Sequence, residues 1–308
     1  MVKVFIDGNQ GTTGLRLYDR LKVRNDIELI TIDEDLRKDK NERRRLINRS
    51  DIAFLCLPDD ASRESVSLCE NENTVLIDTS TAHRTLPDWA YGFPELSEEH
   101  RNKIRNSKRI AVPGCHASGF ISVVYPLIAS GIMPKDYPCV CHSLTGYSGG
   151  GKKMINQYEN EKTDDLFAPR QYGLTQNHKH LKEMQTITGL DTAPIFTPIV
   201  DDYYSGMATT VPLFTRFLNK KSLSDIHGMF TEYYKDSKLI SVLPMSDTPF
   251  VSANEMSGRD SMKIFISGND ERVFITSIFD NLGKGASGAA VQCMNIAMGL
   301  SETAFLEI

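Results

Sequence analysis

A short apolar strand that leads through a glycine-rich turn into an amphipathic helix opens the chain. Residues 2–7 favour β structure, and the stretch "DGNQGTTGLRLYDRL" follows, with Leu15, Tyr18 and Leu21 at helical spacing. Such a turn lets backbone N–H groups approach a pyrophosphate, and the helix N-terminus favours its negative charge. The residues of this predicted dinucleotide-binding loop are Gly8, Gly11, Thr12, Thr13 and Gly14.

Further strand and helix patterns alternate behind the loop. Strands are predicted at 28–32, 51–57 and 74–78, and helices at 41–48 and 61–69. This alternation predicts a doubly wound parallel sheet with right-handed crossovers. The glycine spacing is GxxGxxG, not GxGxxG, so an α/β domain without a nucleotide is the alternative. The place of the pattern on the first strand of such a domain favours dinucleotide binding.

The charged residues after the second strand leave the choice of nicotinamide cofactor open. Asp33 and Asp35 suit a ribose 2′-hydroxyl and favour NAD. Arg37, Lys38 and Lys40 follow at once, and their cationic groups suit the 2′-phosphate of NADP. A solvated charged loop with neither role is a third interpretation.

Composition narrows the class of protein. The 308 residues suit two domains, and the net charge of −5 argues against nucleic acid or an anionic membrane as the main partner. No apolar run reaches transmembrane length, and the first residues read as a strand, not a signal peptide. The six cysteines are expected to be reduced thiols, so we expect a cytoplasmic protein.

Cys115 stands between a Pro-Gly turn and an apolar helical run in "RIAVPGCHASGF". This pattern predicts a helix over 115–130 with Cys115 at its N-terminus. Unpaired N–H groups and the macrodipole there stabilise a thiolate, which is the form that attacks a carbonyl. We therefore expect Cys115 to be a nucleophile. A GxSxG match at 146–150 suggests a serine hydrolase instead, but no HGGG-type oxyanion loop accompanies it.

Two more segments carry candidate site residues. His178 and His180, with Glu183 as an orienting carboxylate, open an expected helix and suit general acid/base catalysis. We expect only one of these histidines to face the cleft, and favour His180 because Glu183 lies three residues on. Arg84, after a predicted parallel strand, suits an anionic substrate group. Neither "HKH" nor "CVC" has the spacing of a zinc site, so no metal is expected.

The second half of the chain reads as an antiparallel or mixed sheet with helices near residues 152 and 224. Alternating strands flank the Asn269-Asp270 turn, and a helix is predicted over 286–300. That helix is expected to return to the nucleotide domain. The predicted domains are 1–114 with 285–308, and 115–284.

Seven motifs run in order from residue 8 to residue 292: GNQGTTG, DTSTAHR, YGFPEL, VPGCHASG, GYSGGGK, NHKHLKEM and DNLGKGASGAAVQ. Together they resemble the short-form N-acetyl-gamma-glutamyl-phosphate reductases of the semialdehyde dehydrogenase family. The resemblance implies a Rossmann-type domain that binds NADP and an α+β catalytic and dimerisation domain, in a homo-oligomer (a dimer or tetramer). Lys182 departs from the family pattern, in which we expect proline.

The resemblance also implies the reaction and the roles of the residues. N-acetyl-L-glutamyl 5-phosphate is reduced by NADPH to the 5-semialdehyde with release of phosphate, through a thioester on Cys115, in arginine biosynthesis. His178 and His180 match the acid/base region, and Arg84 and Glu183 the substrate site. Ser148, Gly149 and Gly150 face the cofactor, and NADPH favours the basic reading of Arg37 and Lys38. The alternatives are an aspartate-semialdehyde dehydrogenase-like reductase and a non-catalytic NADP-binding redox sensor.

Overall fold

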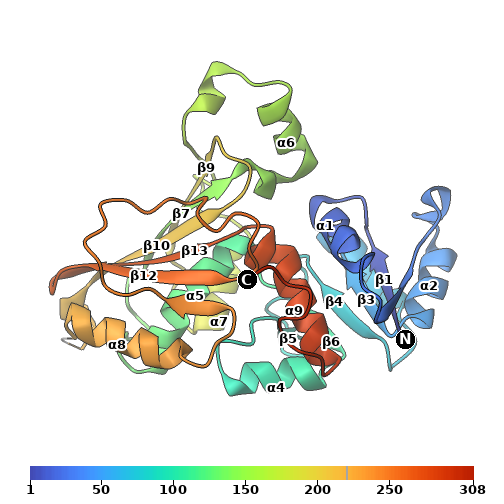
Figure 1. Ribbon diagram of the computed structural model, residues 1–308, viewed down its shortest axis with the longest axis horizontal. Helices are drawn as coiled ribbons and strands as arrows, with labels where there is room; N and C mark the ends of the chain where they lie inside the picture. The colour runs from blue at the N-terminus through green and yellow to red at the C-terminus, as the bar shows by residue number, and fades with distance from the viewer. Residues whose placement is uncertain (220) are drawn as a thin grey trace. The chain divides into compact units, whose positions relative to one another are not determined.

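The computed structural model, which describes residues 1–219 and 221–308, divides the chain at two points (Figure 1). Unit 1 comprises Met1–Pro113 and Ala286–Leu306, and unit 2 comprises Gly114–Gly285 and Glu307–Ile308. The last helix of the chain therefore packs within the unit that holds the N-terminal strands.

Unit 1 contains a six-stranded sheet in the order β2-β1-β3-β4-β6-β5, and every neighbouring pair is parallel. The strands that follow β1 in the chain lie on its two sides, β2 on one and β3 on the other. The direction in which strands are added to the sheet therefore reverses at β1, and α/β sheets bind ligands at such a point. The strands are β1 (Val2–Asp7), β2 (Ile27–Ile30), β3 (Ile52–Leu55), β4 (Val75–Asp78), β5 (Ala90–Tyr91) and β6 (Arg109–Ala111). The predicted parallel sheet is confirmed.

Alternate residues along the central strands of unit 1 enter different cores. Val4 and Ile6 pack in one apolar cluster with residues of the first and last helices, whereas Phe5 packs in a second cluster on the other face with Leu46 and Ile47. Both faces of the sheet are therefore covered, as the doubly wound prediction requires. The helices of unit 1 are α1 (Thr12–Leu21), α2 (Lys40–Arg49), α3 (Asp59–Leu68), α4 (Glu98–Asn106) and α9 (Gly288–Ala297).

Unit 2 contains a mixed seven-stranded sheet in the order β11-β12-β13-β10-β7-β9-β8. The β12–β13 hairpin turns at Asn269-Asp270, as the sequence predicts. The strands are β7 (Val140–Gly146), β8 (Arg170–Gln171), β9 (Ile195–Asp201), β10 (Met207–Phe214), β11 (Ile240–Val242), β12 (Met262–Gly268) and β13 (Arg272–Phe279). The helices are α5 (Cys115–Ala129), α6 (Gly151–Glu159), α7 (His180–Thr188) and α8 (Leu223–Tyr234).

One face of the unit 2 sheet is covered by helices, and the other is partly open. The buried helix α5 packs against β10 and β13 and against α7. On the opposite face, Thr210 pairs with Thr276 and Pro212 with Phe274, whose side chain is 54% exposed. Figure 1 shows α6 beyond the ends of β7 and β9, away from the main body of the sheet.

The last helix begins later than the sequence predicts. The predicted helix over 286–300 is α9 (Gly288–Ala297), and a π-helical turn at Gly283–Ser287 precedes it. The carboxylate of Asp280 accepts the backbone N–H groups of Leu282 and Gly283, which fixes the chain in a loop before the helix starts.

Candidate active site

Cys115 is the first residue of α5 and lies at the helix N-terminus that its sequence position predicts. No side chain caps this end of the helix, and no acidic residue stands in its first turn. The helix therefore supplies no capping or acidic side chain of its own to the N–H groups of its first turn. Such an end stabilises an anion, including a thiolate.

A glycine loop contacts Cys115 from the end of β13. A Cβ atom placed on Gly285 would lie 3.0 Å from the Cβ of Cys115 and 3.1 Å from the carbonyl oxygen of Asp280. A side chain at this position would crowd the cysteine, which explains one glycine of the DNLGKGASG motif. In the sequence, this motif is recognised only through the family resemblance. No local pattern indicates that it lies beside the cysteine.

Four of the remaining cysteines are poor nucleophiles. Desolvation raises the pKa of Cys56 to about 12 and that of Cys139 to about 12, and burial also raises the pKa of Cys69 and Cys141. A thiol with a raised pKa carries little thiolate at neutral pH. These residues are packed thiols, whereas Cys115 occupies a helix N-terminus.

His116, which the sequence interpretation does not single out, is buried beside the cysteine. Its Nδ1 lies 2.6 Å from Oγ of Ser143, and its Nε2 lies 2.6 Å from Oη of Tyr172. Burial, with a smaller effect from the neighbouring His178, lowers the pKa of His116 to about 3. The imidazole is therefore neutral at physiological pH and links β7 to the segment after β8.

His178 and His180 both pack against His116. The ring centroids of His116 lie 6.0 Å from His178 and 5.7 Å from His180, and those of His178 and His180 are 4.7 Å apart. Both rings therefore belong to one cluster with His116, and which of them faces the cleft stays a prediction. His178 precedes the helix, and its Nδ1 accepts the backbone N–H of His180 at 3.2 Å, which folds its ring back over the start of α7.

Burial and the charge of Lys179 lower the pKa of His178 to about 4. Its imidazole is therefore neutral at pH 7, and because Nδ1 accepts a hydrogen bond, its single proton is on Nε2. The half-buried ring of His178 thus presents an N–H donor, while His180 is only 5% exposed.

Glu183 has a partner that the sequence interpretation does not name. Its Oε1 accepts the backbone N–H of Gly114 at 2.8 Å, and the side chain is buried. Gly114 is the N-cap residue of α5. Glu183 therefore joins α7 to the residue directly before the cysteine, a contact between positions 69 residues apart.

The glycine loop of unit 1 has the local features of a phosphate cradle. Gly8 has φ +92°, and a Cβ there would collide with the carbonyl oxygen of Cys56, so only glycine fits. No side chain caps α1, and its first turn has no acidic residue. Oγ1 of Thr12, in that turn, is buried with no hydrogen-bond partner. Open N–H groups and an unpartnered hydroxyl at a helix N-terminus fit a bound pyrophosphate.

Arg37 and Lys38 lie on the surface after β2, the edge strand beside β1. Arg37 closes a short 3-10 turn at Glu34–Leu36, and its Nη1 lies 3.6 Å from the Glu34 carboxylate. An exposed pair of this kind holds the side chain weakly. Both basic side chains are therefore accessible to a ligand phosphate.

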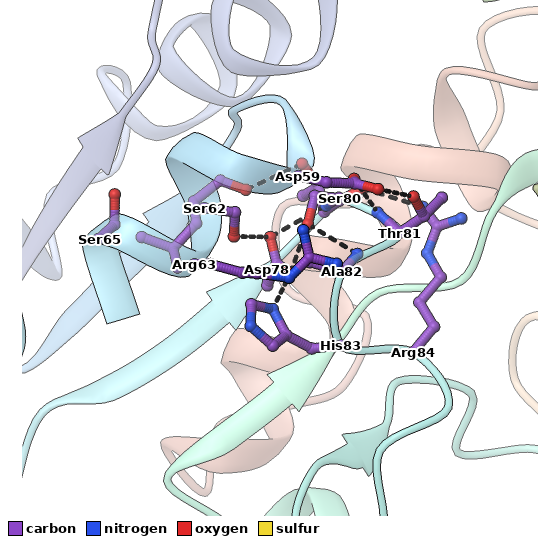
Figure 2. Close-up of polar contacts among 12 residues, drawn as sticks. Asp59, Ser62, Arg63, Ser65, Asp78, Ser80, Thr81, Ala82, His83 and Arg84 are labelled. Carbon is purple, nitrogen blue, oxygen red and sulfur yellow. Dashed lines mark hydrogen bonds and ion pairs between the residues drawn. The ribbon is translucent and has the colours of Figure 1, made fainter. Parts of the chain in front are cut away.

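The segment after β4 folds around the carboxylate of Asp78 (Figure 2). This carboxylate accepts the hydroxyls of Ser62 at 2.8 Å and Ser80 at 2.7 Å and lies 2.6 Å from Nδ1 of His83. The ring of His83 stacks on Trp89 at 4.1 Å. The DTSTAHR motif is thus a loop held by hydrogen bonds to Asp78 at the carboxyl end of a parallel strand.

Arg84 leaves this loop with a buried side chain (Figure 2). Its Nε donates to the carbonyl oxygen of Val112 at 2.8 Å, and its Nη2 donates to that of Thr79 at 2.9 Å. Arg84 therefore ties the loop to the end of β6. Its contact with a substrate anion stays a prediction.

The GYSGGGK loop ends β7 and leads into α6. The hydroxyl of Ser148 is buried and accepts Nδ2 of Asn281 at 3.0 Å, while Asn281 Oδ1 accepts the N–H of Gly206. Gly149 and Gly150 are exposed. Ser148 thus anchors the loop, and the cofactor contact of these three residues stays a prediction.

Within the described residues, no group of three or more His, Cys, Asp or Glu side chains is placed to hold a metal ion. In the same part of the chain, no helix combines the length and apolarity that spanning a membrane demands.

Two family models match the chain. Residues 14–104 match the semialdehyde dehydrogenase NAD-binding domain, and residues 115–281 match the semialdehyde dehydrogenase dimerisation domain. The N-acetyl-gamma-glutamyl-phosphate reductases of Brucella ovis and Brucella canis are each 46% identical over 306 residues, which cover 96% of this chain and 99% of theirs.

Solved structures with the same fold are more distant in sequence. Aspartate semialdehyde dehydrogenase II of Vibrio cholerae superposes with a TM-score of 0.73 at 17% identity, covering 97% of this chain and 98% of that one. The NADP complex of the Candida albicans aspartate semialdehyde dehydrogenase gives 0.67 at 16% identity, covering 97% and 98%. These likenesses show a shared fold.

Proposed function

Because the chain belongs to the semialdehyde dehydrogenase family, we propose that it reduces an acyl phosphate through a thioester on Cys115. It has N-acetyl-gamma-glutamyl-phosphate reductase activity, which belongs to arginine biosynthesis, and it contains an NAD(P)-binding domain. The observation that carries the thioester is the place of Cys115 as the first residue of α5, at the N-terminus of that helix. An activated thiolate is the nucleophile that acyl transfer needs.

The proposed reaction has two stages at the acyl carbon. Thiolate attack forms the C–S bond, breaks the acyl C–O bond and releases phosphate, which takes up one proton from solvent through His180. The bound nicotinamide cofactor supplies the hydride that reduces the thioester. Collapse of the resulting hemithioacetal oxyanion breaks the C–S bond, frees the semialdehyde and returns the thiolate of Cys115.

The histidines take different parts in this scheme. His180 transfers the proton, and Nε2–H of His178 donates a hydrogen bond to the carbonyl oxygen as it becomes negative. The fixed tautomer of His178 supports the second role, because its Nδ1 is already occupied by the N–H of His180. Donors aimed at a developing oxyanion are a large term in acyl-transfer catalysis. Glu183 supports the nucleophile by holding Gly114, and a contact of Glu183 with substrate is part of the same proposal.

The cofactor is proposed to be NADP. Gly8, Gly11, Thr12, Thr13 and Gly14 would hold the pyrophosphate on the N-terminus of α1, and Ser148, Gly149 and Gly150 would approach the cofactor from the loop after β7. Arg37 and Lys38 would pair with the 2′-phosphate, and their exposure supports this role. Arg84 is the proposed partner of the substrate's anionic group. The nucleotide domain is assigned to 1–114 with 285–308, and catalysis to 115–284.

We also assign a homo-oligomer of two or four copies, with the open face of the unit 2 sheet against a second copy. The match to a dimerisation domain and the exposure of Phe274 beside Pro212 on this face support the assignment. Sedimentation of Phe274→Asp would show smaller particles than the wild-type chain if the assignment is right. The reaction is placed in the cytoplasm, where thiols stay reduced.

The central test runs the reaction in reverse. Purified enzyme with N-acetylglutamate semialdehyde and NADP should form NADPH only when phosphate is present, and Cys115→Ser should abolish this. Aspartate semialdehyde serves as the comparison substrate. Full activity of Cys115→Ser would exclude the thioester route, and phosphate-independent turnover would show that the acyl group passes to water and not to phosphate.

A further inference from the structure

The two ring nitrogens of His116 join hydrogen-bonding groups that come from distant parts of unit 2. Nδ1 meets Oγ of Ser143 on β7, and that hydroxyl lies 2.8 Å from Oγ1 of Thr209 on β10. Nε2 meets Oη of Tyr172. Phe196 on β9 packs its ring edge-on at 5.2 Å. Two hydrogen bonds and one ring contact therefore fix the imidazole, and His116 directly follows the nucleophile in the sequence.

A neutral imidazole has one N–H, so its two hydrogen bonds cannot both be donated. If Ser143 donates to Nδ1, then Nε2–H donates to Tyr172, and the phenol proton is left for another acceptor. If Nδ1–H donates to Ser143 instead, Tyr172 must give its proton to Nε2. The direction in which the hydrogen bonds between Thr209, Ser143 and His116 are donated therefore decides whether the Tyr172 hydroxyl can donate its proton to another group.

Tyr172 is the one residue of this hydrogen-bonded series of four that is not fully buried. Its side chain is partly exposed, whereas His116, Ser143 and Thr209 are buried. Its ring also packs against His178 at 6.0 Å. Burial raises the pKa of Tyr172, and the charge of Cys115 raises it further, so the hydroxyl stays protonated and lies within electrostatic reach of the cysteine.

We propose that His116 is a positioning residue, which acts through Tyr172: its Nε2–H holds Oη so that the phenol proton faces the acyl group on Cys115. The inference rests on the proposed thioester function. A packed core histidine needs only to have its polar atoms satisfied. His116 does more, because one of its two partners is the hydroxyl of Tyr172, a partly exposed residue whose ring also packs against His178.

Two amide substitutions separate the two bonds of His116. In His116→Asn the amide overlaps the Nδ1 position and keeps the bond to Ser143, but it does not reach Tyr172. In His116→Gln the amide reaches the Nε2 position and keeps an N–H donor toward Tyr172. Tyr172→Phe removes the hydroxyl itself, and His116→Asn/Tyr172→Phe completes a double-mutant cycle.

We expect His116→Asn and Tyr172→Phe each to lower kcat by roughly 10²-fold, the scale for loss of one oxyanion donor, with KM nearly unchanged. The double variant should be no slower than the slower single variant, because both changes remove the same donor. His116→Gln should retain about ten times the kcat of His116→Asn. Thermal unfolding of all variants separates these effects from loss of folded protein.

Three results would overturn the inference: wild-type kcat in folded His116→Asn, multiplicative losses in the double variant, or equal kcat in His116→Gln and His116→Asn. Iodoacetamide labelling of Cys115 in His116→Asn keeps the two proposals apart. If Cys115→Ser retains activity, the thioester function fails. If Cys115→Ser is inactive and Cys115 is labelled at the normal rate in His116→Asn, the nucleophile is intact. The double-mutant cycle then tests only the role of His116.

Discussion

The carboxylate of Glu183 in α7 accepts the backbone N–H of Gly114, the residue that caps α5, at 2.8 Å. This bond fixes the backbone on the N-terminal side of Cys115 to the helix that begins with His180. One buried hydrogen bond therefore links the residue before the nucleophile to the helix that carries His180. Removing this hydrogen bond should destabilise the backbone at Cys115 without changing a group that takes part in the reaction.

Glu183→Ala should reduce both stability and turnover. It leaves the N–H of Gly114 buried without an acceptor, which costs about 1–3 kcal/mol. Glu183→Gln keeps a carbonyl oxygen in place and should retain most of the free energy of unfolding. Urea unfolding and kcat measured on both variants check this, and equal stability of Glu183→Ala and the wild-type chain would contradict it.

Iodoacetamide at neutral pH should modify Cys115 before any other cysteine and abolish activity. Desolvation raises the pKa of Cys56 and Cys139 to about 12, so these thiols hold almost no thiolate under the same conditions. Peptide mass analysis over time, alongside an activity assay, measures the order. Activity that survives complete labelling of Cys115 would rule out the covalent mechanism.

Replacement of Arg37 and Lys38 together by alanine should weaken NADPH much more than NADH. Hydrogen bonds to charged groups contribute about 1.5–3 kcal/mol each, so KM for NADPH should rise by roughly 10- to 100-fold or more. Arg44→Ala/Arg45→Ala, which removes two exposed cations of α2 that pair with Glu70 and Glu42, is the matched control. An equal loss for both cofactors would place the 2′-phosphate elsewhere.

Glutamine in place of histidine should preserve most of kcat at position 178 but not at position 180. His178→Gln keeps an N–H donor and should remain within about tenfold of wild-type kcat, whereas His178→Ala should lose roughly 10²–10³-fold. His180→Gln cannot transfer a proton and should lose about 10²–10⁴-fold. His227→Gln, a change outside the cluster, is the control. Rescue at 180 and not at 178 would reverse the two roles.

Stability should fall as the solution becomes acidic, in part through two histidines. Burial lowers the pKa of His116 to about 3 and that of His178 to about 4, below the unfolded value of about 6.5. The unfolded chain therefore binds more protons in this window, and stability is present above pH 6.5 and is lost as pH falls toward 4. Each histidine contributes up to about 1.4 kcal/mol per pH unit.

His116→Gln provides the comparison for this pH effect. Its free energy of unfolding between pH 6 and 4.5 should vary less steeply than that of the wild-type chain, because one titrating group is gone. Denaturant titrations at several pH values give both slopes. Identical slopes would mean that His116 binds protons equally in the folded and unfolded states.

Local pattern was sufficient for much of this protein. The alternation of strands and helices in the first hundred residues predicts the doubly wound sheet, since each unit must bury both faces of its strand against helices. The Pro-Gly turn before an apolar run likewise places Cys115 at a helix start, because capping and helix formation depend on neighbouring residues. Family motifs then identify the reaction class.

Only the tertiary structure decided how the site residues meet. His116 reads as one more residue of a buried helix, since its partners Ser143 and Tyr172 lie 27 and 56 positions away and no local spacing connects them. The contact of Glu183 with Gly114, and the inward turn of His178, depend equally on α7 packing against α5. Sequence periodicity determines which face of an element is buried; the long-range packing of two elements determines which polar atoms end up within hydrogen-bonding distance.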